Sequence, residues 1–414
     1  MSIIKPFSAV RPKPEWASAV ASLPYDVMNS KEAAQMAAGN PYSFLHVSRA
    51  EIDMPAGTNE HAQEVYDKAA ENFKKLIADG VLIQEEKPLL YIYAQTMNGR
   101  QQVGLVACSS IDDYFNNVIK KHEFTRPEKE EDRIRHMETV QAHVGPIFLT
   151  YPENKSVNEI IQQVVKQNLP VYDFTAADGV KHAVWLIDNE QHINALVHLF
   201  EKEIPFTYIA DGHHRTASAA KVGLRLREQN VNHTGTEEYN YFLSVLFPDK
   251  QLAIMDYNRL VKDLNGYNAK DFLEQIAAKF EISNPSSEIR IPKSLHEFSM
   301  YLNNTWYTLT AKPNIVQQDP IGILDVTILQ ENILGPLLGI QDPRTDKRID
   351  FVGGIRGLAE LQRRVDNGEM QVAFALYPVS LQQLMDIADS GKVMPPKSTW
   401  FEPKLRDGLF SHLF

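Results

Sequence analysis

The residues best suited to chemistry lie in one short run, Asp211-Gly212-His213-His214-Arg215. It supplies a carboxylate, two imidazoles and an always-charged guanidinium, so it can bind an anion, hold a metal ion and move a proton. The apolar residues before it are typical of a strand, and the alanine-rich residues after it are typical of a helix. A glycine turn that opens a helix leaves backbone N–H groups unpaired beside the positive end of the helix dipole, which favours phosphate. The alternative is a solvated turn with a hydrogen-bonded histidine pair.

A second group of ionisable residues lies in 120–126 and includes His122 and Glu123. A helix is expected over 128–143, and its basic residues at i, i+4 and i+7 share one face: Lys129, Arg133 and His136. Glu123, this basic face and a ligand can therefore meet in one cleft. The alternative is a solvent-exposed face whose cations are neutralised by neighbouring acidic residues: Glu128, Glu130, Glu131 and Asp132.

The third candidate is the segment 394–404, near the C-terminus. Its prolines exclude a regular helix and leave a stiff loop that carries two lysines, Lys397 and Lys404, and the hydroxyl of Ser398. Such a loop can clamp a phosphate or cover a site. A structural strap explains the same composition equally well.

Metal binding has less support in the sequence. Asp211, His213 and His214 carry ligand atoms, but adjacent histidines on one turn rarely reach the same ion, and no HExxH or CxxC pattern indicates zinc. Magnesium held by Asp211 or Glu123 together with substrate phosphates is the more natural arrangement. The chain also lacks a Walker A sequence, a GxGxxG fingerprint, the kinase HRD and DFG motifs and a GxSxG elbow, which disfavours the familiar nucleotide-binding and hydrolase folds.

Composition narrows the class of partner. The chain has 414 residues, 43% hydrophobic and 23% charged, which is typical of a globular protein of two or three domains. A net charge of −11 opposes contact with nucleic acids and anionic membranes. The single cysteine, Cys108, excludes an intrachain disulfide, and no apolar run approaches the ~18 residues of a membrane span. We therefore expect a cytoplasmic protein with a small-molecule substrate and with neither nucleic acid nor membrane as partner; the oligomeric state stays open.

Strand and helix patterns are interleaved, and several strand pairs are hairpins, so the fold class predicted is α+β with mixed sheets. The clearest hairpin joins 89–96 to 102–109 through Asn98-Gly99, and a second is expected to join 241–247 to 252–257. A capping box of Ser156 and Glu159 predicts a helix start. The composition from Asn284 to Ser287 is typical of a linker, so we predict a catalytic region over 1–283 and an additional α/β region over 284–414.

Several motifs together resemble a bacterial and archaeal family catalogued as domain of unknown function 1015. The resemblance spans nearly the whole chain, and the motifs that carry it are Pro24-Tyr25-Asp26-Val27, Asn40-Pro41-Tyr42, Lys121-His122-Glu123, Asp132-Arg133, the run from Asp211 to Arg215, Asn258-Arg259 and Pro395-Pro396-Lys397-Ser398-Thr399. The family's own name implies no activity.

The run at Asp211 also resembles the phosphate-binding turn of the ParB and sulfiredoxin superfamily, which implies a similar core around 206–228. Sulfiredoxin has a cysteine inside this turn, whereas this chain has His213 there. ParB-type function requires DNA, against which the net charge and the absence of a recognisable helix-turn-helix both argue. The superfamily's free-serine kinases carry a similar Asp-Gly-His-x-Arg turn, so the resemblance favours these.

The resemblance implies roles for individual residues. Glu123 would take the proton of a substrate hydroxyl as general base, and Asp211 would hold Mg²⁺ or assist the base, with His213 also in the catalytic set. Gly212, His213, His214 and Arg215 would hold the transferred phosphoryl group. Further contacts to phosphate or nucleotide are expected from His122, Lys129, Arg133, Thr216, Lys397 and Ser398.

These observations lead to a functional hypothesis with two alternatives. The leading one is a phosphotransferase that acts on free serine or a similar small hydroxylated metabolite, with Mg²⁺ and with ATP, ADP or pyrophosphate as donor. The first alternative is a phosphatase that uses the same site on O-phosphoserine. The second is a nucleotide-binding regulatory module without turnover.

Overall fold

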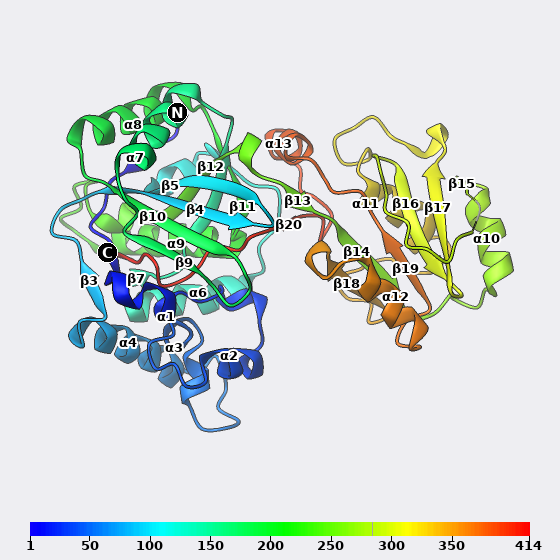
Figure 1. Cartoon of the computed structure of the whole chain (residues 1–414), viewed down its shortest axis with the longest axis horizontal. Helices are drawn as coiled ribbons and strands as arrows, with labels where there is room; N and C mark the ends of the chain where they lie inside the picture. Colours follow the sequence, from blue (N-terminus) through cyan, green and yellow to red (C-terminus); the bar gives the residue numbers. More distant parts are fainter. Residues whose placement is uncertain (284) are drawn as a thin grey trace. The chain divides into compact units, whose positions relative to one another are not determined.

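The protein is described by a computed structural model that covers residues 1–283 and 285–414. Its contacts divide the chain into two compact units (Figure 1). Unit 1 consists of Met1–Leu252 together with Pro403–Phe414, and unit 2 is Ala253–Glu402. The boundary predicted from the sequence, between 283 and 284, falls within the residues of unit 2, and Asn284 itself lies outside the described residues.

The C-terminal segment belongs to unit 1 because it pairs there with the backbone of early residues. Strand β21 (His412–Leu413) lies antiparallel to β7 (Ala142–His143), and the amide of Val10 donates to the carbonyl of Ser411 at 2.9 Å. These pairings join residues more than 250 positions apart in the chain. Local sequence patterns carry no signal for these pairings. The boundary predicted from composition, between 283 and 284, therefore differs from the limits of the two units.

Unit 1 is built on a nine-stranded mixed sheet in the order β6-β11-β8-β12-β5-β4-β10-β9, with β1 paired to β5. Its strands are β1 (Ile4–Lys5), β4 (Leu90–Met97), β5 (Arg100–Ser110), β6 (Ile119–Lys120), β8 (Ile147–Tyr151), β9 (Tyr172–Thr175), β10 (Lys181–Ile187), β11 (Thr207–Asp211) and β12 (Tyr241–Pro248). Strand β11 runs parallel to β6 and antiparallel to β8. Hairpins and crossovers thus occur in one sheet, which confirms the predicted α+β class.

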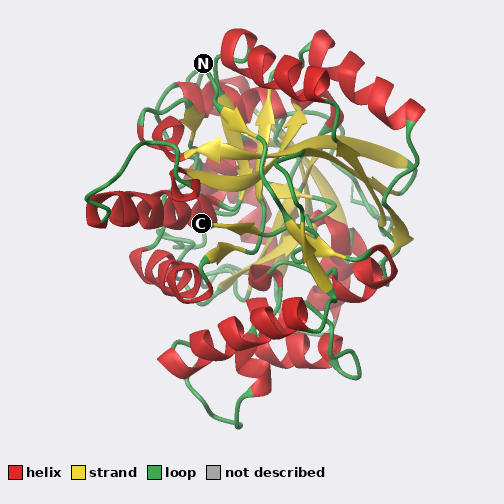
Figure 2. Cartoon of the chain, turned by 90° about the vertical axis from the view of Figure 1, so that its left-hand side faces the viewer, coloured by secondary structure: helices red, strands yellow, loops and turns green. Residues whose placement is uncertain are grey.

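Helices lie on the outside of these strands (Figure 2). The helices of unit 1 are α1 (Ala17–Val20), α2 (Ser30–Ala37), α3 (Leu45–Ser48), α4 (Gln63–Ala78), α5 (Ile111–Phe115), α6 (Pro127–Val140), α7 (Lys155–Gln167), α8 (Glu190–Glu203) and α9 (His213–Gln229). Helix α6 packs against both α9 and α4, so it links the sheet layer to the N-terminal helices. A short ladder of β2 (Val10–Pro12) and β3 (Leu82–Gln84) joins the same N-terminal part.

Local turn chemistry predicts one hairpin correctly and another incorrectly. Strands β4 and β5 meet at Asn98 and Gly99, whose φ angles of 52° and 78° suit the predicted tight turn. The hairpin predicted between 241–247 and 252–257 is wrong. Strand β12 is hydrogen-bonded on one side to β5 and on the other to β8, so neither edge is free for the residues that follow it.

Two predicted helix ends also differ by a few residues. Helix α7 is capped by Asn154, whose side-chain oxygen accepts a hydrogen bond from the amide of Val157 at 3.1 Å, so the capping box predicted at Ser156 is wrong. Helix α6 ends at Gln141, which adopts the left-handed conformation and turns the chain directly into β7.

Unit 2 contains a six-stranded antiparallel sheet in the order β15-β17-β16-β19-β14-β18. The strands of this sheet are β14 (Tyr257–Val261), β15 (Phe280–Ile282), β16 (Glu297–Leu302), β17 (Thr305–Ala311), β18 (Ile349–Gly353) and β19 (Val372–Ala375). Two further strands of unit 2, β13 (Ile254–Met255) and β20 (Trp400–Phe401), pair with each other. Its helices are α10 (Ala269–Ala277), α11 (Asp325–Leu329), α12 (Leu358–Asp366) and α13 (Leu381–Asp389). Buried Leu260, Trp306 and Leu361 form part of its core.

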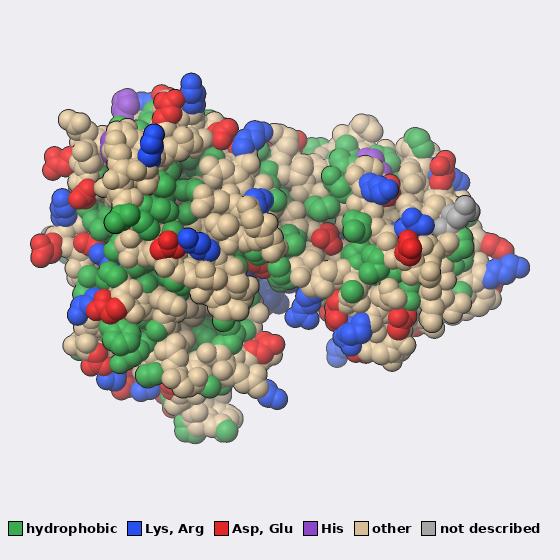
Figure 3. Space-filling model, viewed as in Figure 1, with side chains coloured by type: hydrophobic (Ala, Val, Ile, Leu, Met, Phe, Trp, Pro, Cys, Tyr) green, Lys and Arg blue, Asp and Glu red, His purple; other side chains and the backbone are tan. Residues whose placement is uncertain are grey.

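The outer surface shows no broad patch of one charge on the face in Figure 3, where basic and acidic side chains are interspersed. In the described part of the chain, no helix is long and apolar enough to span a bilayer.

Helix α9 lies close to the segment 238–240 because Gly223 has no side chain. A Cβ on Gly223 would lie 2.2 Å from the carbonyl oxygen of Tyr239 and 2.8 Å from Cδ1 of Ile111. Alanine normally stabilises a helix by about 1 kcal/mol relative to glycine. We predict the opposite sign for Gly223→Ala: a loss of about 1–3 kcal/mol in the free energy of unfolding, measured by urea denaturation. Glu228→Ala, on the exposed side of the same helix, is the control and should change stability by less than about 0.5 kcal/mol. A stabilised Gly223→Ala protein would contradict this packing.

Candidate functional site

The candidate site is centred on the turn between β11 and α9. Gly212 occupies this turn with φ 93° and ψ 35°, a left-handed conformation that glycine adopts without strain. Both the amide and the hydroxyl of Thr216 donate to the carbonyl oxygen of Gly212 at 2.9 Å. Thr216 is fully buried. Its hydroxyl thus makes a hydrogen bond within the turn, and its predicted contact with phosphate stays a prediction.

Asp211 is held on both of its carboxylate oxygens. Oδ1 accepts a hydrogen bond from the amide of Gly212 at 2.8 Å, and Oδ2 lies 3.0 Å from Nζ of Lys404. Burial opposes ionisation of Asp211, but the charges of Lys404 and Arg215 lower its pKa to about 2. Asp211 is therefore a carboxylate at any physiological pH.

Lys404 was part of the proline-rich segment singled out in the sequence, but the two residues predicted there as phosphate ligands were Lys397 and Ser398. Both belong to unit 2, where the Ser398 hydroxyl donates to the carbonyl of Pro395 at 2.6 Å. Their role as ligands stays a prediction. The lysine of this segment that contacts the turn is Lys404, at the point where the chain returns to unit 1.

Two buried histidines lie side by side at the turn. The ring of His122, which follows β6, packs edge-to-face against the ring of His213 with centroids 4.4 Å apart. Burial lowers the pKa of His122 to about 4 and lowers the pKa of His213 well below its ordinary value. Both imidazoles are therefore neutral near pH 7, and each has one nitrogen that donates and one that accepts.

Glu123 reaches this pair. Its Oε2 lies 3.6 Å from Nδ1 of His213, and its side chain is 52% exposed. Glu123 lies 88 residues before Asp211 in the sequence. The parallel pairing of β6 with β11 brings the two residues close together. An exposed carboxylate therefore lies beside the buried histidines.

Arg215 is 5% exposed and is held by groups from two other segments. Its Nη1 donates to the carbonyl of Pro146 at 2.7 Å, and its Nη2 lies 3.9 Å from Oδ2 of Asp26. Burial opposes its charge, but Asp26 and Asp211 raise the pKa of Arg215, so it stays a cation. The Pro24–Val27 motif thus meets the turn through Asp26.

Two residues of the predicted basic face of α6, Arg133 and His136, contact the N-terminal part of the chain. Arg133 stacks on the ring of Tyr25 at 3.9 Å and pairs with Asp132, whose Oδ2 lies 2.6 Å from its Nη2. His136 is buried, with Nε2 3.0 Å from the carbonyl of Val47. Arg133 therefore packs on Tyr25, whose neighbour in the sequence, Asp26, lies 3.9 Å from Arg215.

The remaining two predicted contacts lie at the start of α6. His214 accepts a hydrogen bond at Nε2 from the amide of Arg126 at 3.1 Å, which ties the turn to the loop before the helix. Burial lowers the pKa of His214, and the charges of Arg126 and Lys129 lower it further. Lys129 is half-buried and is close enough to act on His214 through its charge.

Four buried side-chain nitrogens at the turn make no hydrogen bond to any described residue. They are Nδ1 and Nε2 of His122, Nε2 of His213 and Nε of Arg215. A buried polar group without a partner costs about 1–3 kcal/mol, so proteins seldom leave several together. Their place at the N-terminal end of α9 favours an anion as their partner.

Asp211 does not fit the predicted role of magnesium ligand well. One of its oxygens faces the ammonium of Lys404 and the other accepts a backbone hydrogen bond. A cation at 3.0 Å opposes a second cation on the same carboxylate. In the described part of the chain, no group of three or more His, Cys, Asp or Glu side chains is arranged to hold a metal ion. Asp211 is therefore a poor magnesium ligand while it is paired with Lys404. Magnesium held by Glu123 together with substrate phosphates stays a prediction.

The Asp211–Lys404 pair generates a stability prediction. Lys404→Met leaves a largely buried carboxylate without its nearest cation, so we expect a loss of about 3–5 kcal/mol in the free energy of unfolding. In the double variant with Asp211→Asn, part of this loss is recovered, with a coupling energy of about 1–3 kcal/mol measured by urea denaturation. Lys397→Met, an exposed lysine of the same segment, is the control. Additive effects of the two site substitutions would contradict the pairing.

The depressed pKa of His122 predicts acid sensitivity. The unfolded chain protonates this histidine near pH 6.5, whereas the folded protein does so only near pH 4, so stability falls as pH decreases through this window. The contribution of His122 is up to about 3 kcal/mol. His122→Asn should therefore lose that much less stability between pH 7 and pH 4, measured by urea denaturation at each pH. The exposed His198→Asn is the control. Equal losses in wild type and His122→Asn would rule out a buried neutral His122.

Comparison with solved structures finds distant similarity to several proteins. A conserved hypothetical protein from Pyrococcus furiosus is 14% identical, with a TM-score of 0.33, covering 75% of this chain and 95% of that one. A free serine kinase in complex with AMP is 13% identical, with a TM-score of 0.35 and coverage of 74% and 91%. SbnI with a C-terminal truncation, from Staphylococcus aureus, is 12% identical, with a TM-score of 0.39 and coverage of 74% and 87%.

A search of curated proteins gives no match. A family model does match, over residues 4–327, and this range contains the turn together with His122, Glu123 and Asp26 but not Lys404. The matched range is well over half of the chain. The protein therefore belongs to the family described as "Protein of unknown function (DUF1015)".

Proposed function

We propose that the turn between β11 and α9 binds a phosphoryl group, and that the protein transfers this group from a nucleotide or pyrophosphate to free serine or a similar small hydroxylated metabolite. The observation that carries the proposal is the set of four buried nitrogens of His122, His213 and Arg215 without a hydrogen bond to the described residues. Phosphate oxygens accept several hydrogen bonds and carry negative charge, so they suit Nε of Arg215, the single N–H of each neutral imidazole and the N-terminus of α9.

Phosphoryl transfer depends mainly on positioning and on stabilising charge. Arg215 supplies a fixed positive charge, and its contacts with Pro146 and Asp26 restrict its movement. The two neutral imidazoles donate hydrogen bonds without the cost of a second buried cation. Positive charge and donors therefore lie on one side of the proposed phosphoryl position.

Glu123 supplies the base in this proposal. The substrate hydroxyl oxygen attacks phosphorus, the bond from phosphorus to the donor's leaving oxygen breaks, and the hydroxyl proton passes to the Glu123 carboxylate. Glu123 lies against His213, so a hydroxyl beside it would face the group held at the turn. Asp211, locked to Lys404, orients the turn and does not itself take the proton in this scheme.

The phosphatase alternative has one observation in its favour. Because the Glu123 side chain is 52% exposed, water can reach it as readily as a metabolite hydroxyl can. The same site would then hydrolyse O-phosphoserine, with water in place of the serine hydroxyl.

The test follows phosphorus by ³¹P NMR with the full-length protein, magnesium, serine and each donor in turn: ATP, ADP or pyrophosphate. Separate samples contain O-phosphoserine alone. We predict that Glu123→Gln lowers kcat by about 100-fold or more, because the general base is lost while the side-chain shape is kept. Glu128→Gln, an exposed glutamate 3.7 Å from Arg126, is the matched control and should stay within about twofold of wild type.

Two outcomes would contradict the proposal. A Glu123→Gln protein with near wild-type turnover would remove Glu123 as base. Saturable nucleotide binding without turnover of any donor or of O-phosphoserine would instead indicate the regulatory module.

A further inference from the structure

An exposed aromatic side chain follows Glu123 in the loop between β6 and α6. Phe124 is 75% exposed, compared with 43% for Phe115 and 37% for Phe206. Phe115 packs against the ring of Tyr114, and the ammonium of Lys120 lies over the ring of Phe206. Among the residues that the structure describes, no ring or cation stacks on Phe124. Single exposed apolar side chains are common, so the position of this one decides its meaning.

The loop is attached to the turn between β11 and α9 on both sides of Phe124. On one side, Oε2 of Glu123 lies 3.6 Å from Nδ1 of His213. On the other side, the amide of Arg126 donates to Nε2 of His214 at 3.1 Å. Because consecutive Cα atoms are about 3.8 Å apart, the backbone of Phe124 lies within a few ångströms of residues that contact the turn. The exposed ring therefore extends from the edge of the proposed phosphoryl site.

The same loop is also attached to α6. The hydroxyl of Thr125 donates to the side chain of Glu130, in the first turn of that helix. Glu130 is buried and pairs with Lys221 on α9, so the loop, α6 and α9 are joined here. The backbone around Phe124 is thus held in place, whereas its exposed ring can change rotamer quickly to meet a ligand.

A phosphoryl group bound at the turn leaves the rest of its donor near this loop. His122, His213 and Arg215 are buried, so the remainder of the donor must extend outward from them, toward exposed residues. The guanidinium of Arg126 is exposed there, 3.7 Å from Glu128, and suits the further phosphates of a donor. An aromatic ring does not pair with phosphate, but it stacks well on a planar base.

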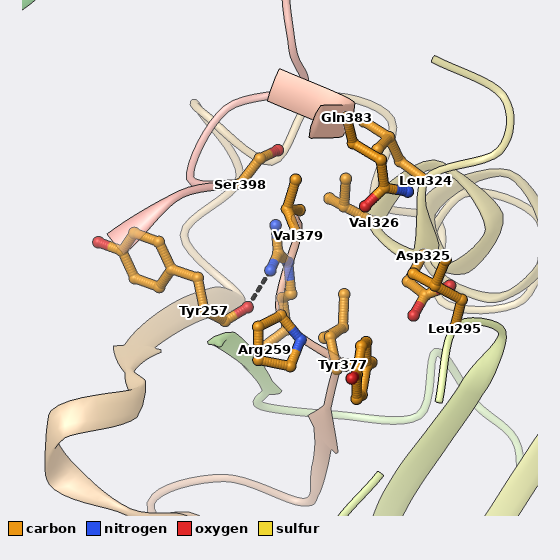
Figure 4. Close-up of a pocket in the computed structure, with 12 residues that line it drawn as sticks. Tyr257, Arg259, Leu295, Leu324, Asp325, Val326, Tyr377, Val379, Gln383 and Ser398 are labelled. Carbon is orange, nitrogen blue, oxygen red and sulfur yellow. Dashed lines mark hydrogen bonds between the residues drawn. The ribbon is translucent and has the colours of Figure 1, made fainter. Parts of the chain in front are cut away.

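The small pocket of unit 2 does not offer another place for a base (Figure 4). Arg259 and Asp325 lie among its lining residues, but its free volume of about 10 Å³ is room for about one water molecule. Both charged residues also have partners: Arg259 donates to the carbonyl of Lys397 at 2.9 Å, and Asp325 lies 3.1 Å from Nδ1 of His296. A nucleobase therefore does not fit there.

We propose that the phosphoryl donor is a nucleotide whose base stacks on Phe124, and not pyrophosphate. This inference rests on the proposed function, because it requires a phosphate group at the turn. Stacking uses the π face that every base has, so adenine and guanine nucleotides bind with similar affinity. Pyrophosphate would leave the ring of Phe124 exposed to water.

The test compares two ligands that share a phosphate and a sugar, AMP and ribose 5-phosphate, of which only AMP carries a base. Each is titrated into the full-length protein by isothermal titration calorimetry. No acceptor is present, so the measurement does not depend on turnover. We expect AMP to bind about fivefold or more tightly than ribose 5-phosphate, and GMP to bind about as tightly as AMP.

Variants then locate the base. Phe124→Ala should reduce the affinity for AMP to that for ribose 5-phosphate and leave the affinity for ribose 5-phosphate unchanged. Phe124→Trp keeps an aromatic face and should keep the preference for AMP. Phe115→Ala, at an exposed phenylalanine of α5, is the matched control and should change neither affinity.

The outcomes separate this inference from the proposed function. Equal affinities of the wild type for AMP and ribose 5-phosphate would overturn the stacking while phosphate binding at the turn stands. A preference for AMP that persists in Phe124→Ala would also overturn it, as would an equal loss of affinity for both ligands in that variant. No binding of AMP, ribose 5-phosphate or pyrophosphate at millimolar concentration would contradict the proposed function, and this inference with it.

Discussion

The ion pair between Asp211 and Lys404 fixes the turn on which the candidate site depends. It joins the last residue of β11 to a lysine 193 positions later, just after the chain returns to unit 1. Because the pair is largely buried, the lysine can keep the carboxylate ionised where burial alone would favour its protonation. The ionised Asp211 in turn helps to keep Arg215 charged one helical turn away. The electrostatics of the site therefore depend on the C-terminal segment.

Further buried charges extend from this pair to the N-terminal part of the chain. Asp26 lies beside Arg215, and Tyr25 next to it packs under Arg133. Asp407 lies in the same group; burial raises its pKa to about 7, although Arg215 lowers it. Positive and negative groups from the N-terminus, α6, α9 and the C-terminal segment are thus interdependent. Such a network restricts the positions of its members, which is what positioning of a phosphoryl group requires.

The local part of this architecture could be predicted from the sequence and the long-range part could not. The strand, glycine turn and helix around Asp211 follow from hydrophobic pattern and turn residues within about twenty positions. The hairpin predicted at 241–257 is wrong because β12 pairs with the distant strand β8. The contact between Lys404 and Asp211 also joins distant segments, so the sequence gives no local signal for it. The role of Lys397 as a phosphate ligand stays a prediction. Helical spacing predicts that His136 belongs to a basic face. Its burial against Val47 depends on packing with the N-terminal part of the chain, for which the sequence around His136 gives no signal.

In the proposed function, the buried side chains of His122 and His213 hydrogen-bond to a phosphoryl group at the turn. The most direct measurement is ¹⁵N NMR of the histidine side chains during titration with pyrophosphate. We predict that the ring resonances of His122 and His213 shift in a saturable way and that their pKa values rise, because a nearby anion favours the protonated imidazole. Unchanged resonances of both histidines at millimolar pyrophosphate, with the protein folded, would contradict the account.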